Sequence, residues 1–135
     1  MALTPNKIAR TVAADFHKDM TTVPGKEDLA RKINEAAVKE SIRNIVLTNR
    51  GERPFQPEFG CDVRKMLFEN ATMQTFDLVK TVIQDAIDIY EPRCELMGVD
   101  VTGDVDSNAI NIAIVFRLIN TDTPTKFNII LNRVR

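Results

Sequence analysis

The sequence predicts an α+β fold in which helices come first and a three-stranded antiparallel β-meander follows. Three observations support this fold class: apolar residues recur at helical spacing through residues 34–90, they alternate with polar residues after residue 94, and short links rich in turn formers join the alternating segments. The chain has 135 residues, enough for one core. We expect residues 1–25 to form an N-terminal arm without sustained periodicity and residues 26–135 to form a single domain.

The first half is expected to begin with a short extended segment. Residues 28–34, DLARKIN, place Leu29 and Ile33 on one face of a strand, although the first turns of a helix fit the same residues. Asn34 follows, and asparagine is a good N-cap. The apolar spacing after it predicts a helix of three to four turns that ends at Leu47.

Two further helices are expected before the sheet. Asp62 is a good N-cap for a short helix in the segment CDVRKMLFEN. Another helix is predicted from Thr72 to Tyr90, where apolar residues fall three and four apart, as in a half-buried helix. It must stop at Glu91, because Pro92 lacks a backbone donor and disfavours helical geometry in the residue before it.

Three strands are predicted, at residues 95–102, 108–120 and 126–134. The links between them, GDVDS and TDTPT, are short, so neighbouring strands should be antiparallel. The middle strand is apolar on both faces, because Ala113 and Val115 lie opposite a row of isoleucines and a phenylalanine. We therefore expect the helices to cover one face of the sheet and another structure to cover the second.

Composition argues against several kinds of ligand. The net charge of -1, from 18 basic and 19 acidic residues, is not the footprint of a protein that binds nucleic acid or anionic lipid. Cys61, Cys94 and His17 are too few for a zinc site, so we expect no metal or cofactor and two reduced thiols. No apolar run is long enough for a signal peptide or a membrane span, so we expect a cytosolic protein whose partners are proteins.

The segment 49–60, NRGERPFQPEFG, combines glycines, prolines, phenylalanines and charges in one loop. One interpretation is a rigid brace, in which prolines restrict the chain, glycines permit backbone angles closed to other residues, and Phe55 and Phe59 enter the core. The architectural residues of this brace would be Gly51, Glu52, Arg53, Pro54, Pro57 and Gly60.

The alternative for this loop is catalysis by a pair of carboxylates held roughly 5–9.5 Å apart, as in glycosidases. The candidates are Glu52, Glu58, Asp62 and Glu69. A chain with 19 acidic residues places several of them near one another by chance, so we favour the brace.

The sequence YEPR, at residues 90–93, places a carboxylate where it is unfavourable. Glu91 lies at the end of a predicted helix, where backbone carbonyls concentrate negative charge, so a cation should answer it. Two interpretations stay open. In the first, Arg93 or a neighbouring base forms a surface ion pair that contributes little. In the second, Glu91 and Arg93 are held apart by Pro92 and form a docking pair for charged groups of a partner.

Taken together, GERPFQPEFG, the following CDVRKMLFEN, a helix ending in YEPR and a β-meander resemble the baseplate-wedge proteins of contractile phage tails, the sheath-initiator family. The resemblance covers about residues 28–135, matches the T-even phage member in order and spacing, and extends to a baseplate subunit of type VI secretion systems. It implies a structural protein of the virion tail baseplate that is assembled in the host cytoplasm. Its partners would be other wedge proteins and the tail-sheath protein, with no small-molecule substrate.

The resemblance also implies roles for particular residues. In the family, a Glu-Pro-Arg motif docks the protein onto the core bundle of the wedge. The corresponding residues here are Glu91, Pro92 and Arg93. The family's sheet resembles the handshake domain of the tail-sheath protein and starts sheath polymerisation by accepting extended arms as added strands. For this strand addition we favour an edge formed by the last strand, where Phe127, Ile129 and Leu131 alternate with largely polar positions.

Two other functions are kept as alternatives. Family members have been labelled lysozymes, so a peptidoglycan-degrading enzyme is the second hypothesis. We expect no enzyme, because no carboxylate pair stands out and a chain with no Trp and one Tyr offers little to line a sugar cleft. The type VI relative shares the fold and the docking and would act in a bacterial cell. Under the docking hypothesis, Arg93→Ala should leave the isolated fold nearly intact and prevent incorporation into the wedge.

Overall fold

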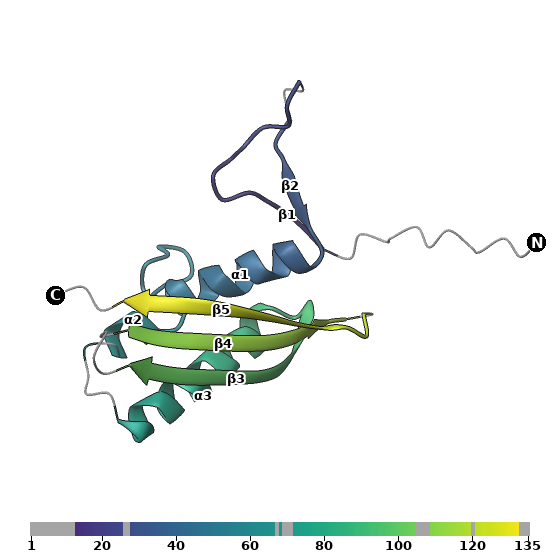
Figure 1. The fold of residues 1–135 in the computed structure, drawn as a ribbon. Helices are drawn as coiled ribbons and strands as arrows, with labels where there is room; N and C mark the ends of the chain where they lie inside the picture. Colours follow the sequence, from purple (N-terminus) through teal and green to yellow (C-terminus); the bar gives the residue numbers. More distant parts are fainter. Residues whose placement is uncertain are drawn as a thin grey trace, which may run out of the picture.

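The computed structural model describes residues 13–25, 28–66, 68, 72–104, 109–119 and 121–132. Within these residues, three helices and five strands follow one another, and the larger sheet lies in front of α3 in Figure 1. In order, these elements are β1 (Ala14–Phe16), β2 (Arg31–Ile33), α1 (Glu35–Leu47), α2 (Val63–Met66), α3 (Met73–Tyr90), β3 (Cys94–Asp104), β4 (Ala109–Leu118) and β5 (Pro124–Asn132).

The larger sheet is an antiparallel meander of order β3-β4-β5, as predicted. Ile112 at its centre pairs with Val101 on β3 and with Ile129 on β5. The register between β4 and β5 runs without interruption from Ala109 to Arg117, whereas β3 has a bulge between Leu96 and Gly98. The sheet therefore has one regular edge strand and one irregular edge strand.

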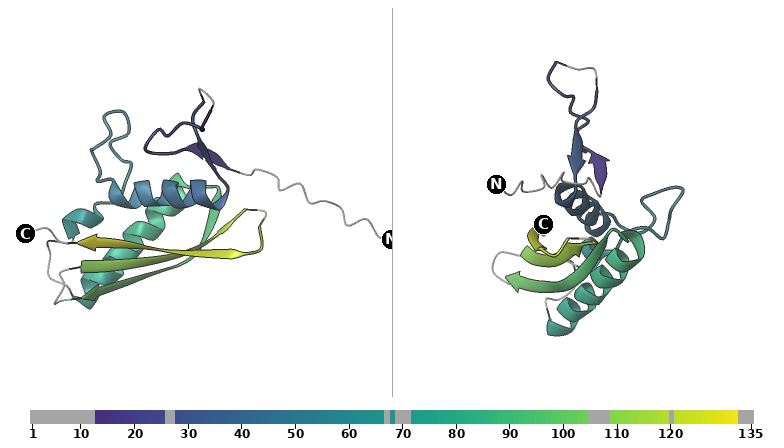
Figure 2. Two further views of the ribbon diagram at one scale, coloured as in Figure 1. Left: turned by 45° about the horizontal axis from the view of Figure 1, so that its top comes forward. Right: turned by 90° about the vertical axis from the view of Figure 1, so that its right-hand side faces the viewer.

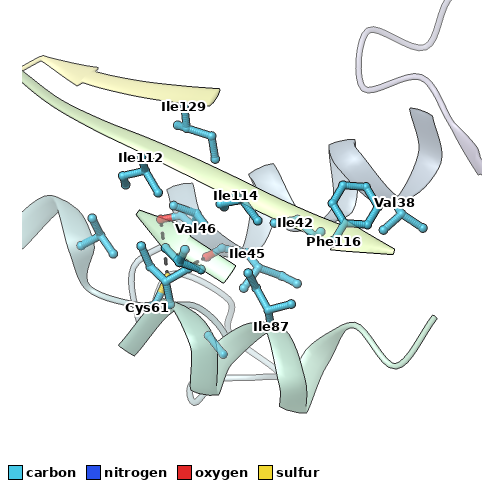
Figure 3. Packing of buried hydrophobic residues seen from close by; sticks show 14 of the residues in the cluster. Val38, Ile42, Ile45, Val46, Cys61, Ile87, Ile112, Ile114, Phe116 and Ile129 are labelled. Carbon is cyan, nitrogen blue, oxygen red and sulfur yellow. Dashed lines mark hydrogen bonds between the residues drawn. The ribbon is translucent and has the colours of Figure 1, made fainter. Parts of the chain in front are cut away.

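Both long helices, α1 and α3, lie on the same face of this sheet (Figure 2). The core fills the space between them, with Ile112, Ile114 and Phe116 of β4 fully buried against residues such as Ile42 and Ile87 (Figure 3). The opposite face carries half-buried or exposed residues: Ala113 and Val115 are half-buried, and Ile130 is 67% exposed. The helices thus cover one face of the sheet, as expected, and no described residue of this chain forms a layer on the other.

The α3 boundaries follow the sequence signals. The Thr72 hydroxyl accepts a hydrogen bond from the Thr75 backbone N–H at 3.2 Å, which satisfies a donor that the helix itself cannot pair. At the other end the helix stops at Tyr90, two residues before Pro92, because the proline excludes another helical turn. These limits confirm the prediction for this helix.

Asn34 occupies the N-cap position of α1, as predicted, but its side chain does not cap the helix. Its carbonyl accepts from the Val38 N–H at 3.1 Å, whereas its φ is 50° and its side chain makes no capping hydrogen bond to α1. Instead its side-chain oxygen accepts from the Ala13 N–H at 3.5 Å, and its backbone N–H donates to the Ala13 carbonyl at 2.7 Å. Asn34 therefore also ties the start of α1 to the residue before β1.

A small antiparallel hairpin, β1–β2, projects from the body of the protein beyond α1 (Figure 1). The strand predicted at residues 28–34 is its second strand, and Asp15 pairs with Lys32 across it. The proposed boundary at residue 25 falls in the turn of this hairpin. Phe16 and Met20 on the hairpin are 57% and 65% exposed, so little of its own apolar surface is buried.

Candidate docking site

The end of α3 positions a clamped ion pair between Glu91 and Arg93. The Arg93 Nε donates to Glu91 Oε1 at 2.6 Å, and Nη2 donates to Oε2 at 2.9 Å. The side chain of Glu91 is 1% exposed and that of Arg93 is 33% exposed. The guanidinium is therefore fixed from below by a buried carboxylate, with its outer edge left toward the surface.

Neither interpretation of YEPR described this arrangement correctly. The pair is not a surface ion pair, because Glu91 is buried, and Pro92 does not hold the two charges apart, because they bond to each other through two hydrogen bonds. Burial alone would raise the pKa of Glu91, but hydrogen bonds from Arg93 and Ser41, with the charge of Arg93, outweigh it and hold that pKa below its usual range. Glu91 is thus an ionised internal anchor for Arg93.

The outer edge of Arg93 is occupied by Asp15 of β1. Asp15 Oδ2 accepts hydrogen bonds from Nη1 and Nη2 of Arg93, both at 3.1 Å. Four of the five guanidinium donors are therefore used by Glu91 and Asp15. The Asp15 side chain is 42% exposed, so solvent or a partner can reach this outer pair.

Nothing in the sequence points to Asp15 as part of this site. It lies 78 residues before Arg93, within the segment predicted to be an arm. Only the pairing of β1 with β2 and the Asn34–Ala13 bonds bring it to the end of α3. Ser41 was missed for the same reason, since its contact with Glu91 depends on the crossing of α1 and α3.

This burial also corrects the expectation for Arg93→Ala. An exposed ion pair contributes little to stability, but removal of one partner from a buried pair leaves an uncompensated charge. The substitution is therefore expected to destabilise the domain rather than to leave it nearly intact. Any test of docking at Arg93 must remove the buried carboxylate at the same time.

The loop at residues 49–60, called the 49–60 loop below, is closed by its own hydrogen bonds. Gly51 N–H donates to the Pro57 carbonyl at 2.8 Å, and both carboxylate oxygens of Glu52 accept from Asn49, at 2.7 and 3.0 Å. The Arg53 guanidinium lies 3.7 Å from the centre of the Phe59 ring. Glu52 thus contacts Asn49, and Arg53 contacts the Phe59 ring, so both charged side chains have partners within the loop.

Gly51 and Gly60 of the loop disfavour a larger residue for different structural reasons. Both have positive φ values, 84° for Gly51 and 105° for Gly60, which disfavour other residues. A Cβ at Gly51 would meet nothing within 4 Å, whereas a Cβ at Gly60 would clash with the backbone carbonyl of Thr48. Gly60 is therefore the position where the loop returns closest to the end of α1.

The loop phenylalanines diverge. Phe59 is half-buried and packs against the core, with its ring 4.9 Å from that of Tyr90, as expected for one of the two. Phe55 is 97% exposed, so the expectation that it enters the core is wrong. It lies in the turn that is closed by the hydrogen bond from the Gln56 N–H to the Arg53 carbonyl, and its side chain is left in solvent.

A groove of about 220 Å³ lies between the hairpin, α1 and the 49–60 loop. Its lining residues are Asp15, Phe16, Lys18, Glu40, Ser41, Asn44, Arg53 and Phe59. Its two acids are already paired, Asp15 with Arg93 and Glu40 with Lys32, each at 3.1 Å. Lys18 and Arg53 have no carboxylate partner in the described part of the chain, so the groove favours a ligand with negative charge.

The proposed strand-accepting residues lie on the inner face of β5. Ile129 and Leu131 are 3% and 7% exposed, and Phe127 packs edge-on against Phe116 with ring centres 5.9 Å apart. Their side chains belong to the core, and the alternate residues, such as Ile130, face outward. What β5 offers a partner is thus its main chain, since β5 pairs only with β4 among the described strands.

The carboxylates considered for catalysis are not arranged as a glycosidase pair. Glu52 is bonded to Asn49, and Asp62 is bonded to Lys65 Nζ at 2.8 Å. The hydrogen bond from Lys65 holds the pKa of Asp62 below its usual value, the opposite of what a general acid needs. Glu58 is exposed, and Glu69 lies outside the described residues. Burial raises the pKa of the Cys61 thiol to about 12, which makes it a poor nucleophile.

The fold and the site define a small α+β assembly subunit, with a clamped arginine, a closed loop and open strand edges. The chain belongs to the family of the baseplate wedge protein gp25, whose family model matches residues 33–123. It is 38% identical over 94 residues to the baseplate wedge protein gp25 of Enterobacteria phage T4, a match that covers 70% of this chain and 71% of that protein. The family predicted from the motifs is thereby confirmed, and the chain is a baseplate wedge subunit of the contractile-tail class.

Solved structures from related machines have the same fold. The crystal structure of a putative tail lysozyme from Geobacter sulfurreducens has a TM-score of 0.65 at 29% identity and covers 73% of this chain and 89% of that chain. A baseplate chain of the anti-feeding prophage has a TM-score of 0.62 at 19% identity, over 87% and 83% of the two chains. A chain from the postcontracted baseplate of pyocin R2 has a TM-score of 0.63 at 20% identity, and the match covers 79% of this chain and 99% of that chain. The last two show the fold alone.

The matched region leaves out a part of the site. Asp15 and the whole of β1 precede residue 33, where the family match begins. Within the described residues, no helix combines the length and the apolar character needed to cross a membrane.

Proposed function

We propose that this chain docks on the core of the baseplate wedge through Glu91, Pro92 and Arg93 and initiates the tail sheath by accepting a strand at the edge of β5. The observation that supports docking is the buried Glu91 carboxylate, which fixes the guanidinium of Arg93 at the end of α3 while a third of the Arg93 side chain stays exposed. A fixed, planar guanidinium is well suited to recognise a carboxylate. In this proposal a carboxylate of the partner replaces Asp15, which is 42% exposed, at the outer edge of Arg93. The groove beside it is lined by Lys18 and Arg53, so it also favours negatively charged groups of a partner.

In this proposal Glu91 acts within the protein and Arg93 acts toward the partner. Pro92 ends α3, so that the chain turns at once into β3 and keeps both side chains at the same end of the helix. The 49–60 loop is the brace that connects this end to α1, through the Phe59–Tyr90 contact and the hydrogen bond from the Tyr90 hydroxyl to the Glu58 carbonyl at 2.7 Å. The described part of the proposed arm, residues 13–25, is joined to the domain by the Asp15–Arg93 pair, the pairing of β1 with β2 and the bonds between Ala13 and Asn34.

For sheath initiation, β5 is the better of the two edges. A bulge interrupts β3, and bulges are a common way in which natural sheets protect an edge from pairing. The β5 strand keeps a continuous register with β4, so its outer main-chain groups form a regular template. An arm of the tail-sheath protein added there would extend the meander to four strands.

We further propose that the protein has no enzymatic role. The Geobacter sulfurreducens protein is called a putative tail lysozyme, and that label applies to that protein. In this chain the candidate carboxylate Glu52 is hydrogen-bonded to Asn49 within the loop, and Asp62 forms an ion pair with Lys65 beside it.

The docking proposal is tested with an apolar replacement of the whole buried pair. In Glu91→Met, Arg93→Met both charges are replaced by side chains of similar volume, a change that is often neutral for folding. We expect this variant to melt near the wild-type temperature but to be lost from complexes with the wedge proteins encoded beside it. The matched control is Glu95→Met, Arg117→Met, which removes an ion pair between β3 and β4 that does not line the groove and should retain binding.

The same samples distinguish the other functions. Retained wedge binding by the folded Glu91→Met, Arg93→Met variant would refute docking at this motif. Peptidoglycan hydrolysis by the wild type that disappears in Glu52→Gln or Glu58→Gln would replace the proposal with an enzyme. Strand addition is tested with a synthetic peptide of the sheath arm: amides of β5 should gain protection from hydrogen exchange, and protection at β3 or at neither edge would contradict it.

A further inference from the structure

An exposed aromatic side chain stands at the end of a loop that is built to be rigid. Phe55 is 97% exposed, the largest exposed fraction of any described large apolar residue. It follows Pro54 in a turn that is closed by a hydrogen bond of 3.1 Å from the Gln56 N–H to the Arg53 carbonyl. Proline at the second position of such a turn fixes its φ angle, so Phe55 is presented in a defined direction.

Three sets of hydrogen bonds fix the loop that carries Phe55. The Gly51–Pro57 hydrogen bond joins its two arms, and the Glu52–Asn49 bonds close its base. The Arg50 N–H donates to the Asp62 carboxylate at 3.2 Å, which fixes the start of the loop to the start of α2. With these bonds in place, the loop stands out from the helical layer as an ordered projection (Figure 2).

The apolar tip is not needed for folding of the loop. Phe59, the second phenylalanine, provides the contact with the core, and the polar groups of Glu52 and Arg53 are satisfied by Asn49 and the Phe59 ring. A large aromatic residue kept in water by a closed loop has lost the free energy that burial would supply. Such a rigid, protruding aromatic residue is the usual form of a binding anchor in protein interfaces.

The loop is joined to the docking end of α3 by direct contacts. The Phe59 ring lies 4.9 Å from that of Tyr90, the residue before Glu91, in a tilted arrangement, and the Tyr90 hydroxyl donates to the Glu58 carbonyl at 2.7 Å. Arg53, one residue before the Pro54–Phe55 tip, also lines the groove that contains Asp15. The groove therefore leads from Asp15, the partner of Arg93, to the first residue of the turn that carries Phe55.

We propose that Phe55 is an anchor that inserts into an apolar pocket on the same wedge protein that binds Arg93. This inference rests on the docking proposed above and adds a second, apolar contact to the charged one. The partner surface then has a carboxylate opposite Arg93 and, beyond the groove, a pocket that accepts one aromatic ring. Because the loop is ordered before binding, little conformational entropy is lost when the ring is inserted.

The test compares Phe55→Ala with Phe55→Leu and with Met73→Ala, a control at a side chain that is 76% exposed at the first residue of α3, the end of that helix opposite Glu91. Thermal melts of the isolated proteins should be unchanged for Phe55→Ala, since the side chain makes almost no contact in the monomer. Affinity for the wedge proteins should fall at least tenfold in Phe55→Ala, fall less in Phe55→Leu and stay unchanged in Met73→Ala.

The outcomes separate this inference from the docking proposal. If Glu91→Met, Arg93→Met loses wedge binding while Phe55→Ala binds like the wild type, docking stands and the anchor is refuted. If Phe55→Ala loses binding while Glu91→Met, Arg93→Met keeps it, the anchor stands and docking at Arg93 is refuted. Concentration-dependent self-association of the wild type that is lost in Phe55→Ala would identify a second copy of this chain as the occupant and would refute a pocket on a wedge protein.

Discussion

Replacing Arg93 by alanine should destabilise the isolated domain far more than loss of a surface arginine. Glu91 would lose both hydrogen bonds from the Arg93 guanidinium while it stays 2% exposed, and Ser41 and the backbone N–H of residue 93 would still donate to it without supplying a charge. Breaking a buried pair in this way typically costs about 3–5 kcal/mol. The outer pair with Asp15 adds little, because both side chains are partly exposed. The expected loss is a large part of the total stability of a domain, which is about 5–15 kcal/mol.

The assay is urea unfolding at pH 7.5 and at acidic pH, with Arg117→Ala as the control. Arg117 pairs with Glu95, but their side chains are 40% and 60% exposed, so this control should cost less than about 1 kcal/mol. The free energy of unfolding follows from the midpoint and the slope, and the slope should not change if the denatured states are alike.

The pH dependence has a definite sign. In the wild type the folded-state pKa of Glu91 is lowered, so the stability from this group is present above its unfolded pKa and is lost as the pH falls through the folded pKa. In Arg93→Ala, burial without a cation raises the pKa of Glu91, so protonation relieves the strain. The difference between the two proteins should therefore be largest near neutral pH, begin to shrink as the pH falls through the raised pKa of Glu91 in Arg93→Ala, and go on shrinking until the pH reaches the lowered pKa of the wild type. A loss below about 1 kcal/mol, or one that does not change with pH, would refute the buried-anchor argument.

Three further experiments test other parts of the structure. Gly51→Ala should cost about 1–2 kcal/mol from its φ angle alone. Gly60→Ala should destabilise the domain by more, because a Cβ at Gly60 also meets the Thr48 carbonyl, and equal losses in urea unfolding would contradict this. Ile112→Asp should abolish the folded state by placing an unpaired charge in the centre of the sheet, and a cooperative melt by circular dichroism would disprove it. Tyr90→Phe should cost about 0.5–1.5 kcal/mol in the same unfolding assay and increase hydrogen exchange in the 49–60 loop; unchanged exchange would mean that the hydroxyl does not hold the loop.

Much of the fold could be predicted because its signals are local. The ends of α3 depend on Thr72 and Pro92, and the meander depends on alternation and short links, all within a few residues of each element. The strand β1 could not be found, because three residues are too few to show a period and their pairing partner lies beyond a turn. Asn34 was misjudged for a similar reason: its preference for capping is local, but its bonds to Ala13 are tertiary.

The pairing of Glu91 with a cation could be anticipated from the sequence, but the way the pair is built into the fold could not. Glu91 attracted attention because a carboxylate at a helix C-terminus needs a cation, and that cation is Arg93. The degree of burial could not be inferred, since it depends on how α1 crosses α3 and where Asp15 lies. The same limit explains Phe55, because the pattern of two phenylalanines in a loop does not say which of them reaches the core.

The bulge in β3 has a consequence for the stoichiometry of assembly. A sheet with two regular edges could accept a strand on each side, and could therefore join subunits into chains without a defined end. Under the strand addition proposed above, the irregular edge at β3 and the regular one at β5 would allow each molecule to accept one added strand. Each copy would then bind one sheath arm, so the number of copies in the baseplate would fix the number of sheath subunits in the first ring.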